Sequence, residues 1–120
     1  MLDTPADELI RWMNRLAVEQ PLIIVEGKKD EAALRNLGLQ NIVTLTKPLF
    51  EIVEDVARTE KTVVILTDLD AKGKELFGKL SKDFQRNGVK VDTAFRRFLL
   101  KSTPLRHIEG LATFVANVQQ

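Results

Sequence analysis

The chain has 120 residues, of which 44% are hydrophobic and 29% are charged, a balance typical of one folded globular domain and not of a disordered segment. Its formal net charge of +1 excludes a strong overall field, so any contact with nucleic acid has to come from a local basic patch. Because it has no cysteine, no run long enough to cross a bilayer and no secretory signal, we expect a single cytoplasmic domain over 1–120 without membrane association.

The first part of the chain predicts a helix followed by a buried strand. Thr4 is a candidate N-cap, and Pro5 suits the first helical position. Apolar residues then recur at helical spacing, which predicts a helix over 5–19. The apolar run at 22–25 is typical of a strand buried on both faces.

Strands and helices alternate through the rest of the chain. The strands are expected at 41–45, 62–66 and 89–92. The helices are expected at 29–37, 48–59, 73–86, 94–101 and 107–118. This alternation predicts an α/β fold with three layers, in which helices flank a mostly parallel four-stranded sheet. The sheet and its crossover helices would occupy about 22–92, and the C-terminal helices about 94–118.

Acidic side chains follow the two most hydrophobic predicted strands. Glu26 comes directly after the first of them, and Asp68 and Asp70 follow the strand at 62–66. If these strands are neighbours in the sheet, the acids face one crevice at its carboxyl edge. Clustered carboxylates repel each other unless a cation neutralises them, and Mg²⁺, or Mn²⁺ in its place, prefers such oxygen ligands. The spacing therefore predicts a metal site.

The residues around the acids allow a functional and a structural interpretation. Asp30 and Asp70 could simply cap the helices that follow them. Gly27 permits a tight turn after the first strand, and Gly73 opens a helix whose amides would favour a phosphate.

Basic residues flank the predicted crevice and could bind phosphates of a nucleic acid. The nearer ones are Lys28, Lys29, Lys72 and Lys74, and the more distant ones are Arg96 and Arg97. An ordinary solvated surface is the alternative, and it is favoured for the two arginines, which are adjacent and cannot share one helix face. His107 is the single histidine, and without a second histidine or a cysteine near it we expect no metal or catalytic role.

The pattern Glu-Gly-x-x-Asp at 26–30, followed by Asp-x-Asp at 68–70 and by Gly73, resembles the signature of the Toprim domain. The residues of both motifs are most similar to those of small stand-alone, archaeal-type Toprim proteins and of the 5S ribosomal RNA maturation nuclease. The resemblance implies Mg²⁺-dependent phosphodiester chemistry. It also implies that Asp68 and Asp70 bind the metal, that Glu26 serves in acid–base catalysis or as a further ligand, and that Asp30 is the second catalytic acid.

Two departures from the family pattern narrow the expected function. Lys72 stands where topoisomerases carry a further acid, and the chain has no tyrosine to act as their nucleophile, which excludes topoisomerase activity by this chain alone. We therefore expect Mg²⁺-dependent nucleic-acid processing, with hydrolytic cleavage of RNA or DNA. Three alternatives stay open: a noncatalytic module that binds metal and nucleic acid or docks onto a larger complex, phosphoryl transfer on a small nucleotide, and a homodimer or other protein partner.

Overall fold

A computed structural model describes residues 3–119 and contains a sheet of four parallel strands in the order β2-β1-β3-β4. The strands are β1 (Ile23–Val25), β2 (Ile42–Thr44), β3 (Thr62–Ile65) and β4 (Lys90–Asp92). β1 and β3 are direct neighbours, with Ile24 opposite Ile65. The adjacency that the predicted acidic crevice requires is therefore confirmed.

The helices follow the predicted order. They are α1 (Pro5–Glu19), α2 (Lys28–Asn36), α3 (Leu49–Ala57), α4 (Ala71–Arg86), α5 (Ala94–Ser102), the 3₁₀ turn η1 (Ile108–Gly110) and α6 (Leu111–Val118). As predicted, Thr4 caps α1 with Pro5 in the first turn.

Two predicted helix starts are wrong, and hydrogen bonds to acidic side chains explain both. α4 begins two residues earlier than expected because the Asp70 side chain caps it by accepting from the Gly73 amide. The predicted helix at 107–118 instead has His107 in extended backbone, followed by η1 and then α6. The N–H of Ile108 donates to the Asp68 carboxylate, so the first turn of this segment is held by the sheet edge and not by a regular helix start.

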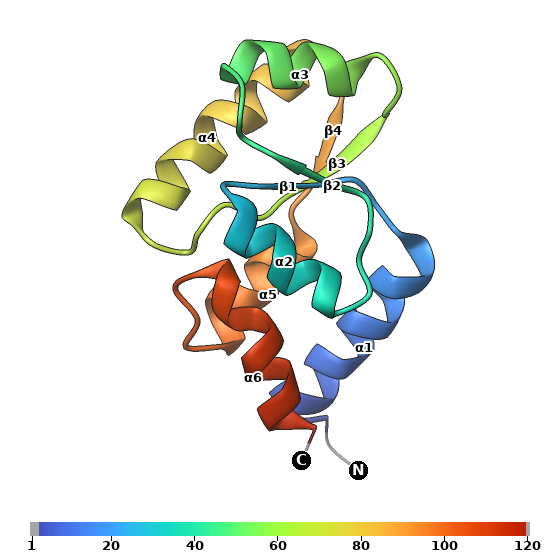
Figure 1. Ribbon diagram of the computed structural model, residues 1–120, viewed down its shortest axis with the longest axis vertical. Coiled ribbons are helices and arrows are strands. Elements are labelled where there is room, and N and C mark those ends of the chain that lie inside the picture. The colour runs from blue at the N-terminus through green and yellow to red at the C-terminus, as the bar shows by residue number, and fades with distance from the viewer. Residues whose placement is uncertain (1–2, 120) are drawn as a thin grey trace.

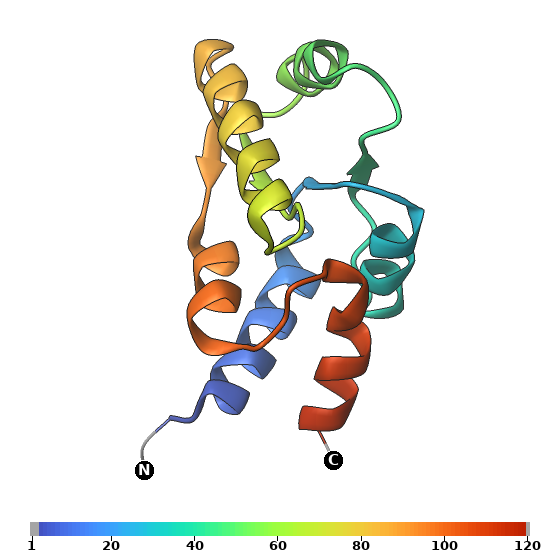
Figure 2. The ribbon, with the colours of Figure 1, turned by 90° about the vertical axis from the view of Figure 1, so that its left-hand side faces the viewer.

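The sheet is covered on both faces, which confirms the three-layer arrangement. Figures 1 and 2 show α3 and α4 on one side of the strands and α1, α2, α5 and α6 on the other. Side chains of a strand alternate between faces. Accordingly, Ile23 and Val25 of β1 join the core beneath α1, α2, α5 and α6, whereas Ile24 packs with the core beneath α3 and α4. Such double coverage explains why the central strands are apolar at every buried position.

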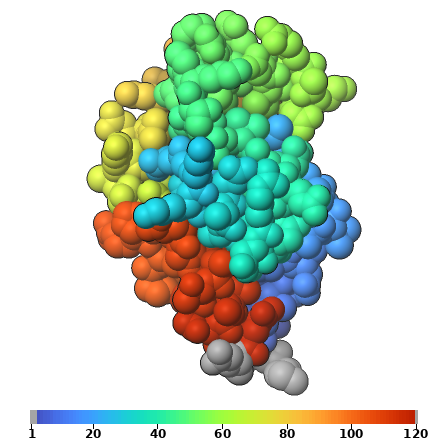
Figure 3. Space-filling model, viewed as in Figure 1, coloured from blue at the N-terminus to red at the C-terminus, as the bar shows by residue number. Residues whose placement is uncertain are grey.

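The C-terminal segment packs against α2. Figure 3 shows the segment in red pressed against α2 in blue-green, and η1 and α6 both contact that helix. Ile108 and Leu111 are completely buried in this contact region. The packing carries residues 107–110 to the carboxyl edge of the sheet. Within residues 3–119, no helix is both long and apolar enough to cross a membrane.

Candidate metal centre and adjoining pocket

Glu26 and Asp68 lie together where β1 and β3 end. The Glu26 Oε2 atom accepts a hydrogen bond from the backbone N–H of Asp68 at 2.8 Å. This bond joins the two loops that carry the acidic motifs, so the predicted meeting of these motifs at one sheet edge is found in the structure.

Asp68 and Asp70 each commit one carboxylate oxygen to the backbone and turn the other towards His107. The Oδ1 atom of Asp68 accepts from the N–H of Ile108 at 2.9 Å, and that of Asp70 accepts from the N–H of Gly73 at 2.8 Å. Their Oδ2 atoms lie 3.4 Å and 3.9 Å from His107 Nδ1. The backbone bonds thus fix the orientation of both carboxylates and leave one oxygen of each free to bind a ligand.

Three side chains can converge on one ion. Within the described range, ligand atoms of Asp68, Asp70 and His107 all lie within 4.8 Å of one another. Glu26, predicted as a further ligand, is not part of this group. Two carboxylate oxygens and one imidazole nitrogen suit a divalent cation, and the nitrogen favours Mn²⁺ or another transition metal over Mg²⁺ more than carboxylates alone would.

His107 is the residue that the sequence analysis missed. Its partners are distant in the sequence, and no histidine or cysteine accompanies it, so no local motif marks it as a ligand. The fold brings it in through the loop before η1, where the N–H of Leu69 donates to the carbonyl of Arg106 at 2.8 Å. This backbone bond and the Ile108–Asp68 bond hold both sides of His107 against the Asp-x-Asp loop.

Arg96 supports the backbone of the loop that carries Asp68. Its side chain is buried, with the residue only 3% exposed, and its guanidinium donates to the carbonyls of Thr67 and Asp68. Burial lowers the pKa of Arg96, while the charges of Glu26, Asp68 and Asp70 oppose that shift. The prediction of a surface phosphate contact at Arg96 is corrected, because its donors hold the loop in place.

Arg97 turns the other way. It is exposed, unlike its buried neighbour, as expected for adjacent positions on one helix.

Gly73 is required by close packing. A Cβ atom at this position would lie 1.8 Å from the carbonyl oxygen of Asp68, closer than any side chain can approach. The N–H of Gly73 is bonded to Asp70, and its carbonyl accepts from the Thr67 hydroxyl at 2.6 Å. The predicted phosphate contact of the Gly73 amide is therefore corrected: this amide is used internally, and the glycine lets α4 approach the loop that carries Asp68 and Asp70.

Asp30 caps α2 and lies among other acids. It is 8% exposed, and its Oδ2 atom accepts from the N–H of Gly27 at 3.1 Å. Burial raises the pKa of Asp30, and the charges of Asp68, Glu26 and Glu109 add to that shift, while the Gly27 hydrogen bond opposes it. Asp30 therefore does not precede the helix as predicted: it is the third residue of α2, and its side chain closes the first turn by binding the amide of the N-cap residue, Gly27.

The four predicted lysines lie on the first turns of two helices. Lys28 and Lys29 are on α2, Lys72 and Lys74 are on α4, and all four are exposed. Within residues 3–119 none of them forms an ion pair with an acid. They surround the carboxyl edge of the sheet with positive charge that is available to an anion.

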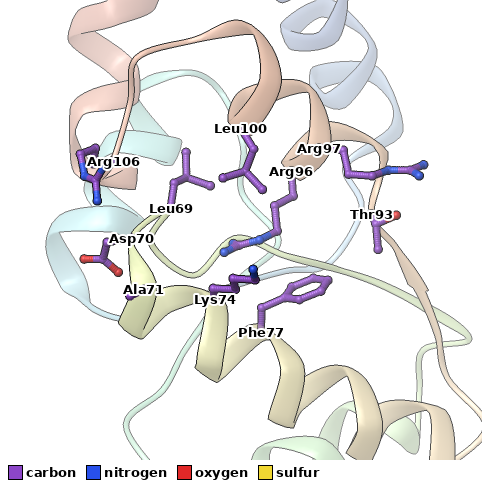
Figure 4. A pocket seen from close by; sticks show the side chains of 10 residues that line it. All are labelled: Leu69, Asp70, Ala71, Lys74, Phe77, Thr93, Arg96, Arg97, Leu100 and Arg106. Carbon is purple, nitrogen blue, oxygen red and sulfur yellow. The ribbon is translucent and has the colours of Figure 1, made fainter.

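A pocket of about 440 Å³ adjoins the metal centre between α4 and α5. Figure 4 shows Asp70 and Arg106 at one end and Thr93 and Arg97 at the other. The lining between these ends comes from Leu69, Ala71, Lys74, Phe77, Arg96 and Leu100. The sequence analysis did not predict this pocket, because its walls come from three segments that no motif links.

Comparison with known proteins identifies the family. The Toprim domain profile matches residues 20–95. The chain belongs to the Toprim domain family.

This Toprim protein is similar to proteins of archaea. It is 34% identical over 113 residues to the UPF0292 protein of Methanocaldococcus jannaschii, a match that covers 90% of this chain and 88% of the relative. It is 46% identical over 91 residues to the UPF0292 protein of Pyrococcus abyssi, covering 74% of this chain and 67% of the relative.

A solved structure, described as a putative protein from Aquifex aeolicus, is also similar. Its TM-score is 0.77 at 33% identity, and the match covers 84% of this chain and 95% of that one. Toprim membership together with the Asp68–Asp70–His107 group indicates a metal-dependent role in nucleic-acid processing.

Proposed function

We propose that this Toprim protein is a nuclease that hydrolyses phosphodiester bonds with the help of Mg²⁺ or Mn²⁺. One observation carries the proposal: the free oxygens of Asp68 and Asp70 and the Nδ1 atom of His107 converge beside Glu26, at the carboxyl edge of the sheet. In parallel α/β sheets this edge is where ligands bind.

In the proposed hydrolysis, the metal ligands would hold the ion and Glu26 would act as the general base. A divalent ion bound at this position would stabilise negative charge on phosphate oxygens and make a water molecule more acidic. Glu26 holds the Asp68 backbone through Oε2, and among the described residues its Oε1 atom has no hydrogen-bond donor. Oε1 can therefore accept the proton of an attacking water. Asp30 is buried, and its carboxylate accepts from the N–H of Gly27. We therefore assign it the role of positioning Gly27 and Glu26, without direct contact with the substrate.

Substrate binding would rest on the exposed lysines. Lys28 and Lys29 lie on one side of the carboxyl edge and Lys72 and Lys74 on the other, so a phosphate backbone that crosses the metal centre passes both pairs. Such contacts position a nucleic acid without reading its sequence. These contacts act on the phosphate backbone, so RNA and DNA are both candidate substrates.

The test is a cleavage assay on structured RNA and DNA in Mg²⁺, in Mn²⁺ and in EDTA. The wild type is compared with Glu26→Gln and Asp68→Asn, and with Glu54→Gln as the control, because Glu54 is an exposed acid on α3, a helix on the opposite side of the sheet from η1 and α6. Loss of a general base typically slows a reaction by about 10²- to 10⁴-fold. We expect losses of this size for both site variants and none for the control.

Two results would contradict the proposal in different ways. Cleavage that persists in both site variants would show that the assigned residues are not the active site. Tight binding of RNA without cleavage under any divalent metal would instead identify a noncatalytic binding module. Folding of each variant is checked by its thermal unfolding curve, so that a lost activity is not confused with a lost structure.

A further inference from the structure

We infer that the pocket between α4 and α5 receives one unstacked nucleobase from a single-stranded segment of the substrate, next to the metal centre. This inference rests on the proposed function and adds a substrate class to it: unpaired nucleotides. The pocket volume of about 440 Å³ lies within the range of small-molecule sites, about 300–1,000 Å³.

The middle of the pocket is built for a flat apolar group. Leu69, Phe77 and Leu100 line it from three segments. The Arg96 guanidinium lies over the Phe77 ring, 4.8 Å from its centroid, which keeps this planar cation in place against the aromatic face. Nucleobases bind to proteins by packing against aromatic rings and other flat apolar surfaces, and Phe77 with Leu69 and Leu100 supplies such a wall.

The charges at the pocket favour an anionic ligand. Lys74, Arg97 and Arg106 line it, and within the described chain none of these three cations is paired with an acid. A neutral apolar ligand would gain nothing from them. A nucleotide carries a flat base and a charged phosphate on one molecule, so it matches both the apolar walls and the cationic rim.

The position of the pocket links it to the metal centre. Asp70 lies at the end of the pocket, as Figure 4 shows, and its Oδ2 atom is one of the candidate metal ligands. Leu69, which also lines the pocket, stands between Asp68 and Asp70 in the sequence. A phosphate bound at the metal centre would therefore place the base attached to it at the pocket entrance, where Arg106 and Lys74 accompany the phosphate.

A base inside a duplex cannot use this pocket. It is stacked on both faces and paired along its edge, and leaving the stack costs a few kcal/mol, which is equivalent to a loss of binding of about 100-fold. An unpaired nucleotide avoids that cost. Thr93 at the far end of the pocket adds a hydroxyl that can donate to or accept from the exposed edge of the base.

The test measures binding in EDTA, where cleavage does not interfere. Fluorescence anisotropy compares a labelled single strand, the same strand with one internal abasic site placed in turn at each position, the matching duplex and a mononucleotide. The protein variant is Leu100→Ala, since Leu100 is 53% exposed and lines the pocket. The control is Phe50→Ala, because Phe50 is 60% exposed and lies on α3.

We expect the strand that lacks the critical base to bind about tenfold more weakly, as is usual when one stacking contact is lost. Leu100→Ala removes apolar surface from the pocket wall and should weaken the binding of strands that carry the base. The control should bind as the wild type does. Equal binding of all strands, with and without each base, would overturn the inference even if metal-dependent cleavage is found. A mononucleotide that binds as tightly as the strand would overturn it too, because the pocket would then serve a free nucleotide. The converse result, base-dependent binding without cleavage under any metal, would support the pocket and reject the nuclease.

Discussion

The Glu26 carboxylate accepts the backbone N–H of Asp68 at 2.8 Å, so the acid that ends β1 holds the loop that ends β3. Glu26 thereby links the two acidic motifs physically. Any change at Glu26 that removes this acceptor consequently affects the position of Asp68 as well as the chemistry of the site.

The first prediction separates these two effects at Glu26. Glu26→Ala removes the acceptor and leaves a partly buried N–H unpaired, which should lower the free energy of unfolding by about 1–3 kcal/mol. Glu26→Gln keeps an oxygen acceptor in the same place and should lose clearly less. Urea unfolding of both variants measures the difference. Equal stabilities would mean that the Asp68 hydrogen bond contributes nothing to folding.

Two glycines of α4 give a matched pair. Gly73→Ala forces a Cβ atom into the Asp68 carbonyl, and we expect a loss of about 3 kcal/mol together with weaker metal binding. Gly78→Ala on the same helix meets nothing within 4 Å and should stabilise the protein by about 0.5–1 kcal/mol, because alanine is the better helix former. Thermal unfolding and a metal titration test both variants. A Gly73→Ala protein as stable as the wild type would refute the close packing of α4 on the loop.

Arg96, which is buried, and Arg97, which is exposed, form a second matched pair of positions. Arg96→Met removes the charged donors from the carbonyls of Thr67 and Asp68, so we expect a loss of about 2–4 kcal/mol. Arg97→Met alters an exposed side chain and should change stability by no more than about 0.5 kcal/mol. The measurement is chemical denaturation of each variant beside the wild type. Similar small effects at both positions would show that Arg96 does not support the loop.

His107 should raise the affinity of the site for Mn²⁺ more than its affinity for Mg²⁺. His107→Ala removes a nitrogen ligand, and imidazole contributes more to binding Mn²⁺ than to binding Mg²⁺. We expect the Mn²⁺ affinity to fall by about 10- to 100-fold, a range seen when metal sites lose a supporting group, with a smaller change for Mg²⁺. Isothermal titration calorimetry with each metal measures both values. If Mn²⁺ binds the variant as well as the wild type, His107 is not a ligand.

Asp30 predicts a pH dependence of stability. Burial and neighbouring acids raise the pKa of Asp30 above its value in the unfolded chain, so the folded protein holds this proton to a higher pH. Stability should therefore fall as the pH rises from the unfolded pKa through the raised one. Asp30→Asn keeps an acceptor for Gly27 without the charge. In EDTA it should be more stable than the wild type at neutral pH, and this advantage should vanish at acidic pH. An advantage that does not change with pH would contradict the assignment.

Much of the fold could be predicted from local patterns. The apolar runs at β1 and β3 indicate strands covered on both faces, and the Thr4-Pro5 pair places the start of α1, because each depends on neighbouring residues alone. The acids that follow these strands could be placed at one edge for the same reason.

The residues that the sequence analysis missed depend on contacts between distant segments. His107 reaches the acids only because the backbone of Arg106 and Ile108 bonds to the Asp-x-Asp loop. Arg96 looks like a surface cation in the sequence, and its burial follows from the way α5 packs beneath that loop. Neither contact leaves a periodicity or a motif in the chain.

The attachment of residues 106–108 to the loop at 68–69 has a consequence for local opening of the protein. Undocking of residues 106–108 would break the bonds from Leu69 to Arg106 and from Ile108 to Asp68, and would carry His107 away from both aspartates. The three-ligand group can therefore be taken apart without unfolding of the sheet.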